Sequence, residues 1–258
     1  MEEYLNFAGR LADAARETAM PYFRGAVAVQ NKGDDSPVTV ADRECEKKMR
    51  ALIAETYPRH SVYGEEFGGE IGGGFVWVLD PIDGTRSFIS GSRQFCALVA
   101  LVCDGAPVVG VIDMPALGER WAGCDSPRCR RAIFNGAPCA VSGRTELSSA
   151  VMATTTLGVA EDSRDLALRR LCRRAGHVRL GGDASAFGAL ASGFLDAAAD
   201  YEMACYDYLP LTPIVRAAGG VITDWRGAAP AFVAGTTGIV AAASGALHEA
   251  ALSALAGE

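Results

Sequence analysis

The sequence predicts a mixed α/β (α+β) protein, with mostly antiparallel strands in its first half and alternating strands and helices in its second. Residues 75–79 are five apolar residues in a row, which indicates a strand buried on both faces, although a helix fragment has the same pattern. Residues 95–102 and 107–112 flank Cys103-Asp-Gly-Ala106, a hairpin signature. Residues 2–24 carry apolar side chains at helical spacing.

Length and composition are those of an ordinary soluble protein. The chain has 258 residues, of which 50% are hydrophobic and 21% charged, enough to bury a sizeable core. We expect one domain, 1–258, with two sub-halves at about 1–145 and 146–258. The formal net charge of −7 argues against a general nucleic-acid binder, but bound metals would still allow an anionic phosphate to bind. No run of residues predicts a signal peptide or a membrane span, so we expect a cytoplasmic location without membrane contact.

The other elements of the first half follow from the same patterns. Residues 25–33 predict a short strand and turn, and 40–57 a helix that Pro58 ends. Five glycines between 68 and 74 predict a flexible connection. The first half is completed by a predicted turn at 86–92 and by strands at 120–123 and 131–134.

In the second half, short apolar runs alternate with helical periodicity. The predicted helices are 162–175, 184–192, 208–218 and 246–255. The predicted strands are 148–155, 177–180, 194–199, 221–223 and 238–243.

Two carboxylates stand three residues apart directly after the apolar run 75–79. In Asp80-Pro-Ile-Asp-Gly-Thr85, proline cannot continue a central strand and Asp-Gly is a turn signal, so both carboxylates fall on a tight turn with the Thr85 hydroxyl beyond them. A second acidic pair, Glu65-Glu66, follows the short apolar segment 61–64. Carboxylates packed together repel one another unless cations join them, and such oxygen ligands suit Mg²⁺. A solvated surface turn is the alternative explanation of an isolated motif of this kind.

Four separated motifs, in the same order along the chain as in the family, resemble the inositol monophosphatase superfamily of lithium-sensitive, Mg²⁺-dependent phosphatases. Asp80-Pro-Ile-Asp-Gly-Thr85 matches the central motif of that family, and Gly64-Glu-Glu66 matches its upstream segment. Val38-Thr-Val-Ala-Asp42 resembles a third segment, and Tyr206-Asp207 with the following Ala218-Gly-Gly220 resembles the fourth. The resemblance implies a layered α-β-α-β-α sandwich of the inositol monophosphatase and fructose-1,6-bisphosphatase type, inhibition by lithium and assembly as a homodimer.

The resemblance also implies a set of metal ligands. Glu65, Asp80 and the carbonyl oxygen of Ile82 would hold one Mg²⁺, and Asp80, Asp83 and Asp207 would hold a second, with Asp80 bridging. A third, weaker ion would lie near Glu65 and Glu66, and Mn²⁺ would substitute for Mg²⁺. Two metals a few ångströms apart stabilise both the attacking and the leaving oxygens of an in-line displacement.

The residues implied to act in catalysis are Thr85, Asp42 and Glu65. Asp42 would accept a hydrogen bond from Thr85, whose hydroxyl would orient the nucleophilic water, and the backbone amides of Gly84 and Thr85 would bind a phosphate oxygen. Family members use the loop around Lys32 as a flap that carries a lysine toward the site. Asp42 in a first helical turn is also explained by helix-end stabilisation, and Lys32 by a solvated loop.

The substrate is less closely specified than the chemistry. Five further segments resemble the histidinol-phosphate phosphatase branch, namely 83–91, 110–115, 118–121, 181–183 and 206–207. The ammonium and imidazole groups of histidinol phosphate would give Asp183, and Asp200 or Glu202, something to bind, although Asp183 is also a good helix N-cap. Departures from the branch pattern at Met114, 208–209 and 216–217 put the substrate in doubt.

Two rival functions stay open at the level of sequence. One is another phosphatase of the same scaffold, acting on inositol phosphate, a sugar bisphosphate or a 3′-phosphonucleotide. The other is a non-catalytic metal- or phosphate-binding regulatory protein, which retention of every proposed ligand argues against.

The cysteines do not predict a metal site. Eight cysteines occur without a Cys-x-x-Cys pair, and three histidines are present, which argues against zinc. Cys124 and Cys129 flank a four-residue segment and could pair, but we expect reduced thiols, and none of the cysteines has a catalytic role.

Overall fold

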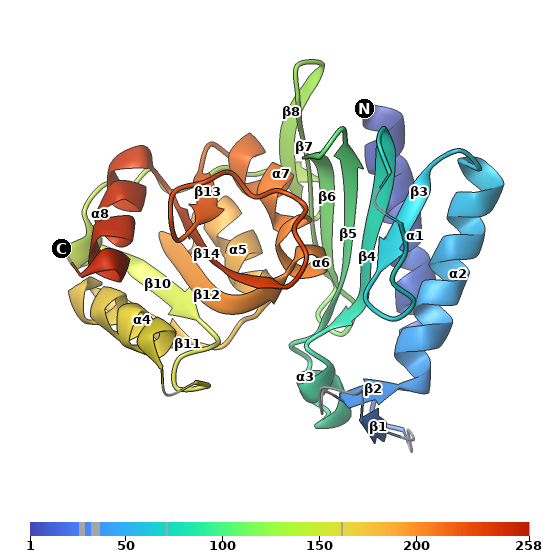
Figure 1. Cartoon of the computed structure of the whole chain (residues 1–258), viewed down its shortest axis with the longest axis horizontal. Helices are drawn as coiled ribbons and strands as arrows, with labels where there is room; N and C mark the ends of the chain where they lie inside the picture. The colour runs from blue at the N-terminus through green and yellow to red at the C-terminus, as the bar shows by residue number, and fades with distance from the viewer. Residues whose placement is uncertain (26–28, 32–36, 71, 161, 258) are drawn as a thin grey trace.

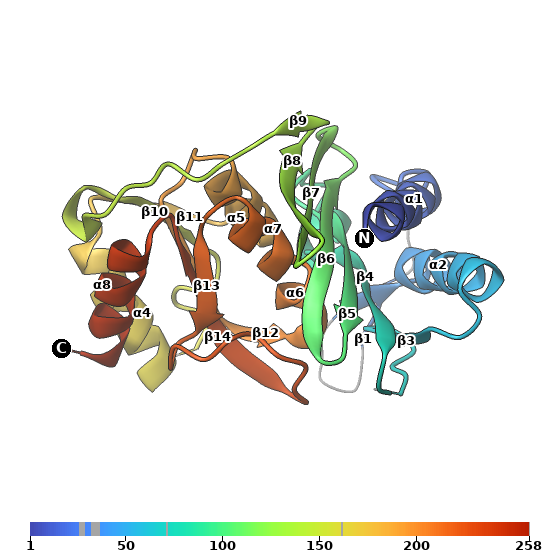
Figure 2. The same ribbon diagram turned by 90° about the horizontal axis from the view of Figure 1, so that it is seen from above.

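Five layers of helix and sheet make up the molecule, in the order α-β-α-β-α (Figures 1 and 2). The computed structural model describes residues 1–25, 29–31, 37–70, 72–160 and 162–257, so the predicted flap residue Lys32 lies outside the described residues. The predicted layered sandwich is confirmed. In the described residues, no helix combines the length and apolar character that crossing a membrane requires.

The first sheet has seven strands in chain order. They are β3 (Ser61–Gly64), β4 (Phe75–Asp83), β5 (Cys96–Cys103), β6 (Ala106–Met114), β7 (Glu119–Ser126), β8 (Cys129–Phe134) and β9 (Ala137–Pro138). β3 pairs with β4 in parallel, and every later pair is antiparallel. The mostly antiparallel first half therefore agrees with the sequence pattern.

Strand β4 is buried on both faces, as its unbroken apolar run predicts. Trp77 and Leu79 face the helices α1 (Glu2–Ala19) and α2 (Val40–Thr56), whereas Val78 faces the middle layer of the molecule. The helices α1 and α2 cover the outer face of this sheet (Figure 2). The short strands β1 (Val29–Asn31) and β2 (Pro37–Thr39) form a separate pair that leads into α2.

The second sheet has five strands in the order β11-β10-β12-β14-β13. Its strands are β10 (Val151–Thr154), β11 (His177–Leu180), β12 (Ala197–Ala204), β13 (Val221–Asp224) and β14 (Thr236–Ala242). The one-turn helix η1 (Leu147–Ser149) precedes β10, and the helices α4 (Ser163–Arg174) and α8 (Gly245–Ala256) cover the outer face. The core between them includes Leu168, Leu171, Leu247 and Ala251.

The middle layer consists of α5 (Ala184–Ala191), α6 (Cys205–Tyr208) and α7 (Leu211–Ala217), between the two sheets. Phe187 and Ile214 from these helices share one core with Leu98 of the first sheet and Ala241 of the second. The functional site described below lies at this seam, so its residues come from both halves of the chain.

Several predicted elements differ from the structure, each for a physical reason. β4 continues through Pro81 because a bulge, with a register shift between Asp80 and Asp83, removes the need for a proline N–H in the ladder. The predicted turn at 86–92 is largely the short helix α3 (Thr85–Ile89). The single helix predicted at 208–218 is instead two, α6 and α7, separated at Leu209-Pro210.

The expectation of reduced thiols at Cys124 and Cys129 was wrong. The two residues form a disulfide across the β7–β8 hairpin, with their Cα atoms 5.8 Å apart. Antiparallel pairing of Ser126 with Cys129 brings the two side chains within bonding range. The other six cysteines are free.

Candidate metal and phosphate site

Strand pairing brings the two acidic motifs together. Because β3 and β4 run parallel, Glu65 after β3 and Asp80 and Asp83 at the end of β4 emerge at the same edge of the sheet. The backbone N–H of Glu65 donates to the carbonyl oxygen of Leu79 at 3.1 Å, which fixes the start of the Glu65 loop to β4. The parallel pairing of β3 and β4 therefore brings Glu65 close to Asp80, which their spacing in the sequence does not show.

Asp207 joins this group from the second half of the chain. It lies on α6, and its Oδ2 accepts a hydrogen bond from the N–H of Ala204 at 2.7 Å, which caps the helix. Asp80, Asp83 and Asp207 each offer a carboxylate oxygen, and these oxygens all lie within 4.8 Å of one another. Residues more than a hundred positions apart in sequence thus form one acidic cluster.

The carboxylates of this cluster disfavour one another's ionisation. Burial and the nearby charges of Glu65, Asp83 and Asp207 raise the pKa of Asp80, which is 2% exposed. Burial, together with the charge of Asp183, raises the pKa of Asp83 to about 7. Burial and the charge of Asp83 raise the pKa of Asp207. An apolar surrounding with this many acids is stable in ionised form only when positive charge enters it.

The second half also contributes a backbone contact to Asp83. Its Oδ2 accepts hydrogen bonds from the thiol of Cys96 at 3.3 Å and from the N–H of Ala184, the first residue of α5, at 3.4 Å. Burial and the charges of Asp83 and Asp80 raise the pKa of Cys96, so the thiol stays protonated and donates. These two bonds orient the carboxylate toward the seam between the sheets.

The turn after Asp83 has the backbone shape that its glycine predicts. Gly84 has φ 79°, a left-handed conformation, and α3 begins at the next residue. The Thr85 hydroxyl donates to the carbonyl oxygen of Ile82 at 3.2 Å. Asp42 is fully buried in the first turn of α2. Its bond to Thr85, and coordination of a metal by the Ile82 carbonyl, stay predictions.

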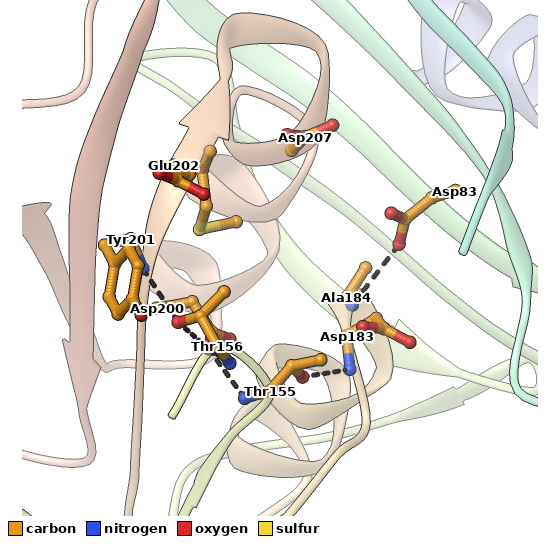
Figure 3. A pocket seen from close by; sticks show the side chains of 10 residues that line it. Asp83, Thr155, Thr156, Asp183, Ala184, Asp200, Tyr201, Glu202 and Asp207 are labelled. Atoms are coloured by element: carbon orange, nitrogen blue, oxygen red, sulfur yellow. Dashed lines mark hydrogen bonds between the residues drawn. The ribbon is translucent and has the colours of Figure 1, made fainter. Parts of the chain in front are cut away.

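A cleft of about 550 Å³ opens beside the acidic cluster. Its lining includes Glu65, Asp83 and Asp207, together with two further acidic residues, Asp183 and Glu202. Within the narrower cavity of about 140 Å³, Asp83 and Asp183 lie on one side and Tyr201 and Glu202 on the other (Figure 3). The cluster therefore faces a space large enough for a small phosphorylated metabolite.

Asp183 does not act as the helix cap that its position before α5 allows. Its side chain makes no capping hydrogen bond, and its backbone has φ 43°, which is rare for a residue other than glycine. Its own N–H donates to the Thr155 hydroxyl at 2.9 Å, and burial raises the pKa of its carboxyl. A strained acidic residue that faces the cleft is typical of a binding position.

Asp200 and Glu202 have different surroundings, although both lie on β12. Asp200 is 4% exposed, and its Oδ1 accepts hydrogen bonds from the N–H groups of Thr155 and Thr156 at 2.6 and 2.9 Å, which shapes the turn along the cleft. Glu202 is exposed, has φ 62° in the bulge of β12, and forms a 2.9 Å ion pair with Arg164. Of the two, Glu202 is the better placed to meet a ligand.

Comparison with known proteins agrees with this site. A family model described as the inositol monophosphatase family matches residues 1–257. The chain belongs to this family.

Members of the inositol monophosphatase family are phosphatases, and several resemble this chain over nearly its whole length. The chain is 38% identical over 264 residues to the bifunctional phosphatase IMPL2, chloroplastic, of Arabidopsis thaliana, covering 99% of this chain and 75% of the relative. It is 38% identical over 226 residues to a histidinol-phosphatase of Chlorobaculum parvum, covering 86% of each. The structure of an inositol monophosphatase from Zymomonas mobilis superposes with a TM-score of 0.88 at 36% identity, covering 99% and 98% of the two chains.

The residues of the cluster fit the metal dependence general in the inositol monophosphatase family. Asp80, Asp83 and Asp207 offer carboxylate oxygens alone, which are the ligands that Mg²⁺ prefers over nitrogen and sulfur. The raised pKa values identify an excess of negative charge that a divalent ion would neutralise. The donor set therefore suits a hard divalent cation.

The sequence did not identify the residues that line or support the cleft but are not proposed as metal ligands or catalytic groups. Thr155, Thr156 and Tyr201 line it, and Arg164 holds Glu202. A threonine run at the end of a predicted strand is a common sequence, so nothing in it pointed to these contacts. The pairing of β10 with β12, which brings Thr154 to Asp200, becomes visible only in the fold.

Proposed function

We propose that the protein is a Mg²⁺-dependent hydrolase of a small phosphate monoester, with histidinol phosphate as its substrate. The observation that carries the proposal is the convergence of Asp80, Asp83 and Asp207 within 4.8 Å, beside a cleft whose wall includes Asp83 and Asp207. In this reading Glu65, Asp80, the Ile82 carbonyl, Asp83 and Asp207 hold the ions. Bound Mg²⁺ would supply positive charge that favours attack by water on the phosphorus and stabilises the departing oxygen.

The chain's own groups orient the reactants. The Thr85 hydroxyl, set by the turn of Gly84, would position the attacking water after turning its proton from the Ile82 carbonyl to the buried Asp42. The backbone N–H groups of Gly84 and Thr85 would bind a phosphoryl oxygen. Since no protein nucleophile is required, the protonated thiol of Cys96 serves only to orient Asp83.

The further carboxylates of the cleft support a cationic substrate. Asp183 and Glu202 line the same cleft as Asp83 and Asp207, where the organic part of a bound monoester could contact them. Histidinol phosphate carries an ammonium and an imidazole, both of which hydrogen-bond well to carboxylates. The similarity to the histidinol-phosphatase of Chlorobaculum parvum supports the same choice.

The first test changes the charge of one ligand. Purified protein is expected to release phosphate from histidinol phosphate only when Mg²⁺ or Mn²⁺ is present. Asp83→Asn keeps the size of the side chain but removes a charge, and it should lower phosphate release by at least about a hundredfold while the circular dichroism spectrum stays unchanged. Full activity of the variant, or activity in excess chelator, would refute the proposed chemistry.

The second test compares substrates. The kcat/KM for histidinol phosphate should exceed that for inositol 1-phosphate, a sugar bisphosphate and a 3′-phosphonucleotide. A higher value for inositol 1-phosphate would favour an inositol monophosphatase, which the similarity to the Zymomonas mobilis structure makes the main alternative. Metal binding without turnover of any substrate would instead support the non-catalytic alternative.

A further inference from the structure

A buried ion pair on α2 contacts the loop that carries Glu65. Glu46 is fully buried, and its Oε1 accepts a hydrogen bond from Arg50 Nε, one helical turn farther along α2, at 2.7 Å. Its Oε2 accepts from the backbone N–H of Glu66 at 2.7 Å. Neither residue lies on the wall of the cleft, so the metal site as described above leaves this pair without a role.

The same pair reaches the other end of the loop. Arg50 Nη2 donates to the carbonyl oxygen of Gly68. Gly64 and Gly68 bond to each other through both of their backbone groups at 2.9 Å, which closes the loop 64–68. A Cβ atom on Gly64 would lie 2.0 Å from Glu46 Oε1, so the loop packs against the carboxylate as closely as a glycine permits.

The loop holds the Glu65 carboxylate beside other carboxylates that repel it. The Glu65 N–H donates to the carbonyl oxygen of Leu79, the residue before Asp80, at 3.1 Å, and Glu65 lines the same cleft as Asp83 and Asp207, so it lies among the acidic residues of the cluster. Without a cation, the charges of the cluster push Glu65 outward, because like charges at this distance repel strongly. Contacts to the loop backbone are what can resist this displacement.

We propose that Glu46 and Arg50 are positioning residues for the metal site, which hold the Glu65 loop against the acidic cluster before an ion binds. The inference rests on the proposed function, since it gives the metal ligand Glu65 a supporting contact. The buried carboxylate satisfies the Glu66 N–H, and the guanidinium neutralises that carboxylate and fastens Gly68. Both groups come from one helix, whose first turn also carries Asp42, so α2 connects two parts of the site.

The test measures metal binding directly, with no turnover required. Metal-free protein is titrated with Mn²⁺, and bound ion is followed by electron paramagnetic resonance for the wild type, Glu46→Gln, Glu46→Ala and Arg50→Lys. Supporting contacts around metal ligands typically contribute 10- to 100-fold in affinity, so Glu46→Ala should weaken binding by about that factor. Glu46→Gln keeps an acceptor for the Glu66 N–H and should lose less.

The control is a matched ion pair whose residues do not line the cleft. Asp196 is also a buried carboxylate, 5% exposed, that accepts from a backbone N–H, that of Val151, and from an arginine, Arg144, each at 2.9 Å. Asp196→Asn should lose a similar amount of thermal stability yet bind Mn²⁺ as the wild type does. Equal weakening in Asp196→Asn would show a general effect of stability and would overturn the inference.

A second readout separates positioning from catalysis. For Glu46→Gln, the Mg²⁺ concentration at half-maximal activity should rise about tenfold, whereas KM and kcat at saturating Mg²⁺ should stay within about twofold of the wild type. Folded Glu46 and Arg50 variants with unchanged Mn²⁺ affinity would overturn the inference. If Glu46→Ala does not fold, the Mn²⁺ affinity of Arg50→Lys tests the inference. This variant keeps the positive charge but loses the two-point contact of the guanidinium. A wild type that binds Mn²⁺ but releases no phosphate would remove the proposed function and leave the binding comparison intact.

Discussion

Individual carboxylates of the cluster reduce the stability of the metal-free fold. Asp80 is almost fully buried, whereas Asp83 and Asp207 are partly exposed, and all three have raised pKa values. A carboxyl whose pKa is higher in the folded than in the unfolded protein holds its proton more tightly when folded. This tighter proton binding stabilises the fold at a pH below the pKa of the unfolded state, which is near 3.8 for Asp83. The stabilisation is lost as the pH rises through the pKa of the folded state, about 7.

This reasoning predicts the stability of Asp83→Asn in excess chelator. At pH 8 the variant should unfold at a higher temperature than the wild type, with an advantage on the order of 2 kcal/mol, because an amide avoids the cost of a buried charge. At pH 4.5, where the folded wild type keeps the proton, the difference should shrink toward zero. Differential scanning calorimetry at the two pH values checks this, and a variant less stable at pH 8 would contradict the account.

The sequence could identify those site residues that stand together in one short segment with a recognisable turn and charge pattern. Asp80, Asp83 and Thr85 stand in one short segment, where turn chemistry and charge suggest their role. Asp207 was reachable only through resemblance to a family, because nothing in its surroundings relates it to Asp80. Glu46 was beyond reach, since a glutamate on a polar helix is ordinary and its contact with the Glu66 N–H arises from the packing of α2 against the loop.

Elements position the site through close backbone contacts. A Cβ on Gly110 of β6 would lie 1.9 Å from the Pro210 carbonyl oxygen, and one on Gly123 of β7 would lie 2.7 Å from the Cα of Ile214. The segment from α6 to α7 therefore rests directly on the first sheet. Since Asp207 lies on α6, these two glycines set how closely it approaches the carboxylates of β4.

Gly123→Ala is expected to disturb both folding and the site. The added methyl group must push α7 away from β7, which should lower the free energy of unfolding by about 1–3 kcal/mol. If the displacement reaches α6, Asp207 moves away and Mg²⁺ binding weakens in parallel. Urea unfolding with and without Mg²⁺ measures both effects. Gly245→Ala, at the first residue of α8, where φ is not positive and no atom lies within 4 Å of the added Cβ, is the control for a substitution without close contacts or backbone strain.

Element prediction succeeded where periodicity is strong and failed where tertiary packing decides. The buried strand β4, the hairpin of β5 and β6, and α2 lie where apolar patterning placed them, within a few residues. The bulge that admits Pro81 into β4, and the division of one predicted helix into α6 and α7, depend on contacts between the halves. A local pattern contains no information about such contacts.

At the scale of the whole molecule, the site joins two halves that face each other across the middle helices. Asp80 and Asp83 lie on β4 of the first sheet and Glu65 follows its strand β3, whereas Asp207 and Asp183 come from segments of the second half. A divalent ion between them would therefore link the halves as well as neutralise charge. Homodimer assembly, lithium inhibition and a cytoplasmic location stay predictions.

Metal removal should accordingly destabilise the molecule as a unit. Adding Mg²⁺ at a hundred times its dissociation constant to metal-free protein is expected to raise the free energy of unfolding by about 2.7 kcal/mol for one site. Excess chelator should reverse the shift, and Ca²⁺ or Mn²⁺ should allow comparison of ion size. Thermal unfolding in each condition measures this, and the lack of any shift would indicate that the acidic cluster does not bind ions in the folded state.

The central claim is that the carboxylates from both halves form one divalent metal site. Crystals soaked in Mn²⁺ and measured at the manganese absorption edge test it most directly. An anomalous scattering peak is expected within bonding distance of oxygens of Asp80, Asp83 and Asp207, and it should disappear or weaken strongly in Asp83→Asn. Crystals that diffract well with manganese elsewhere but with no peak among these three side chains would contradict it.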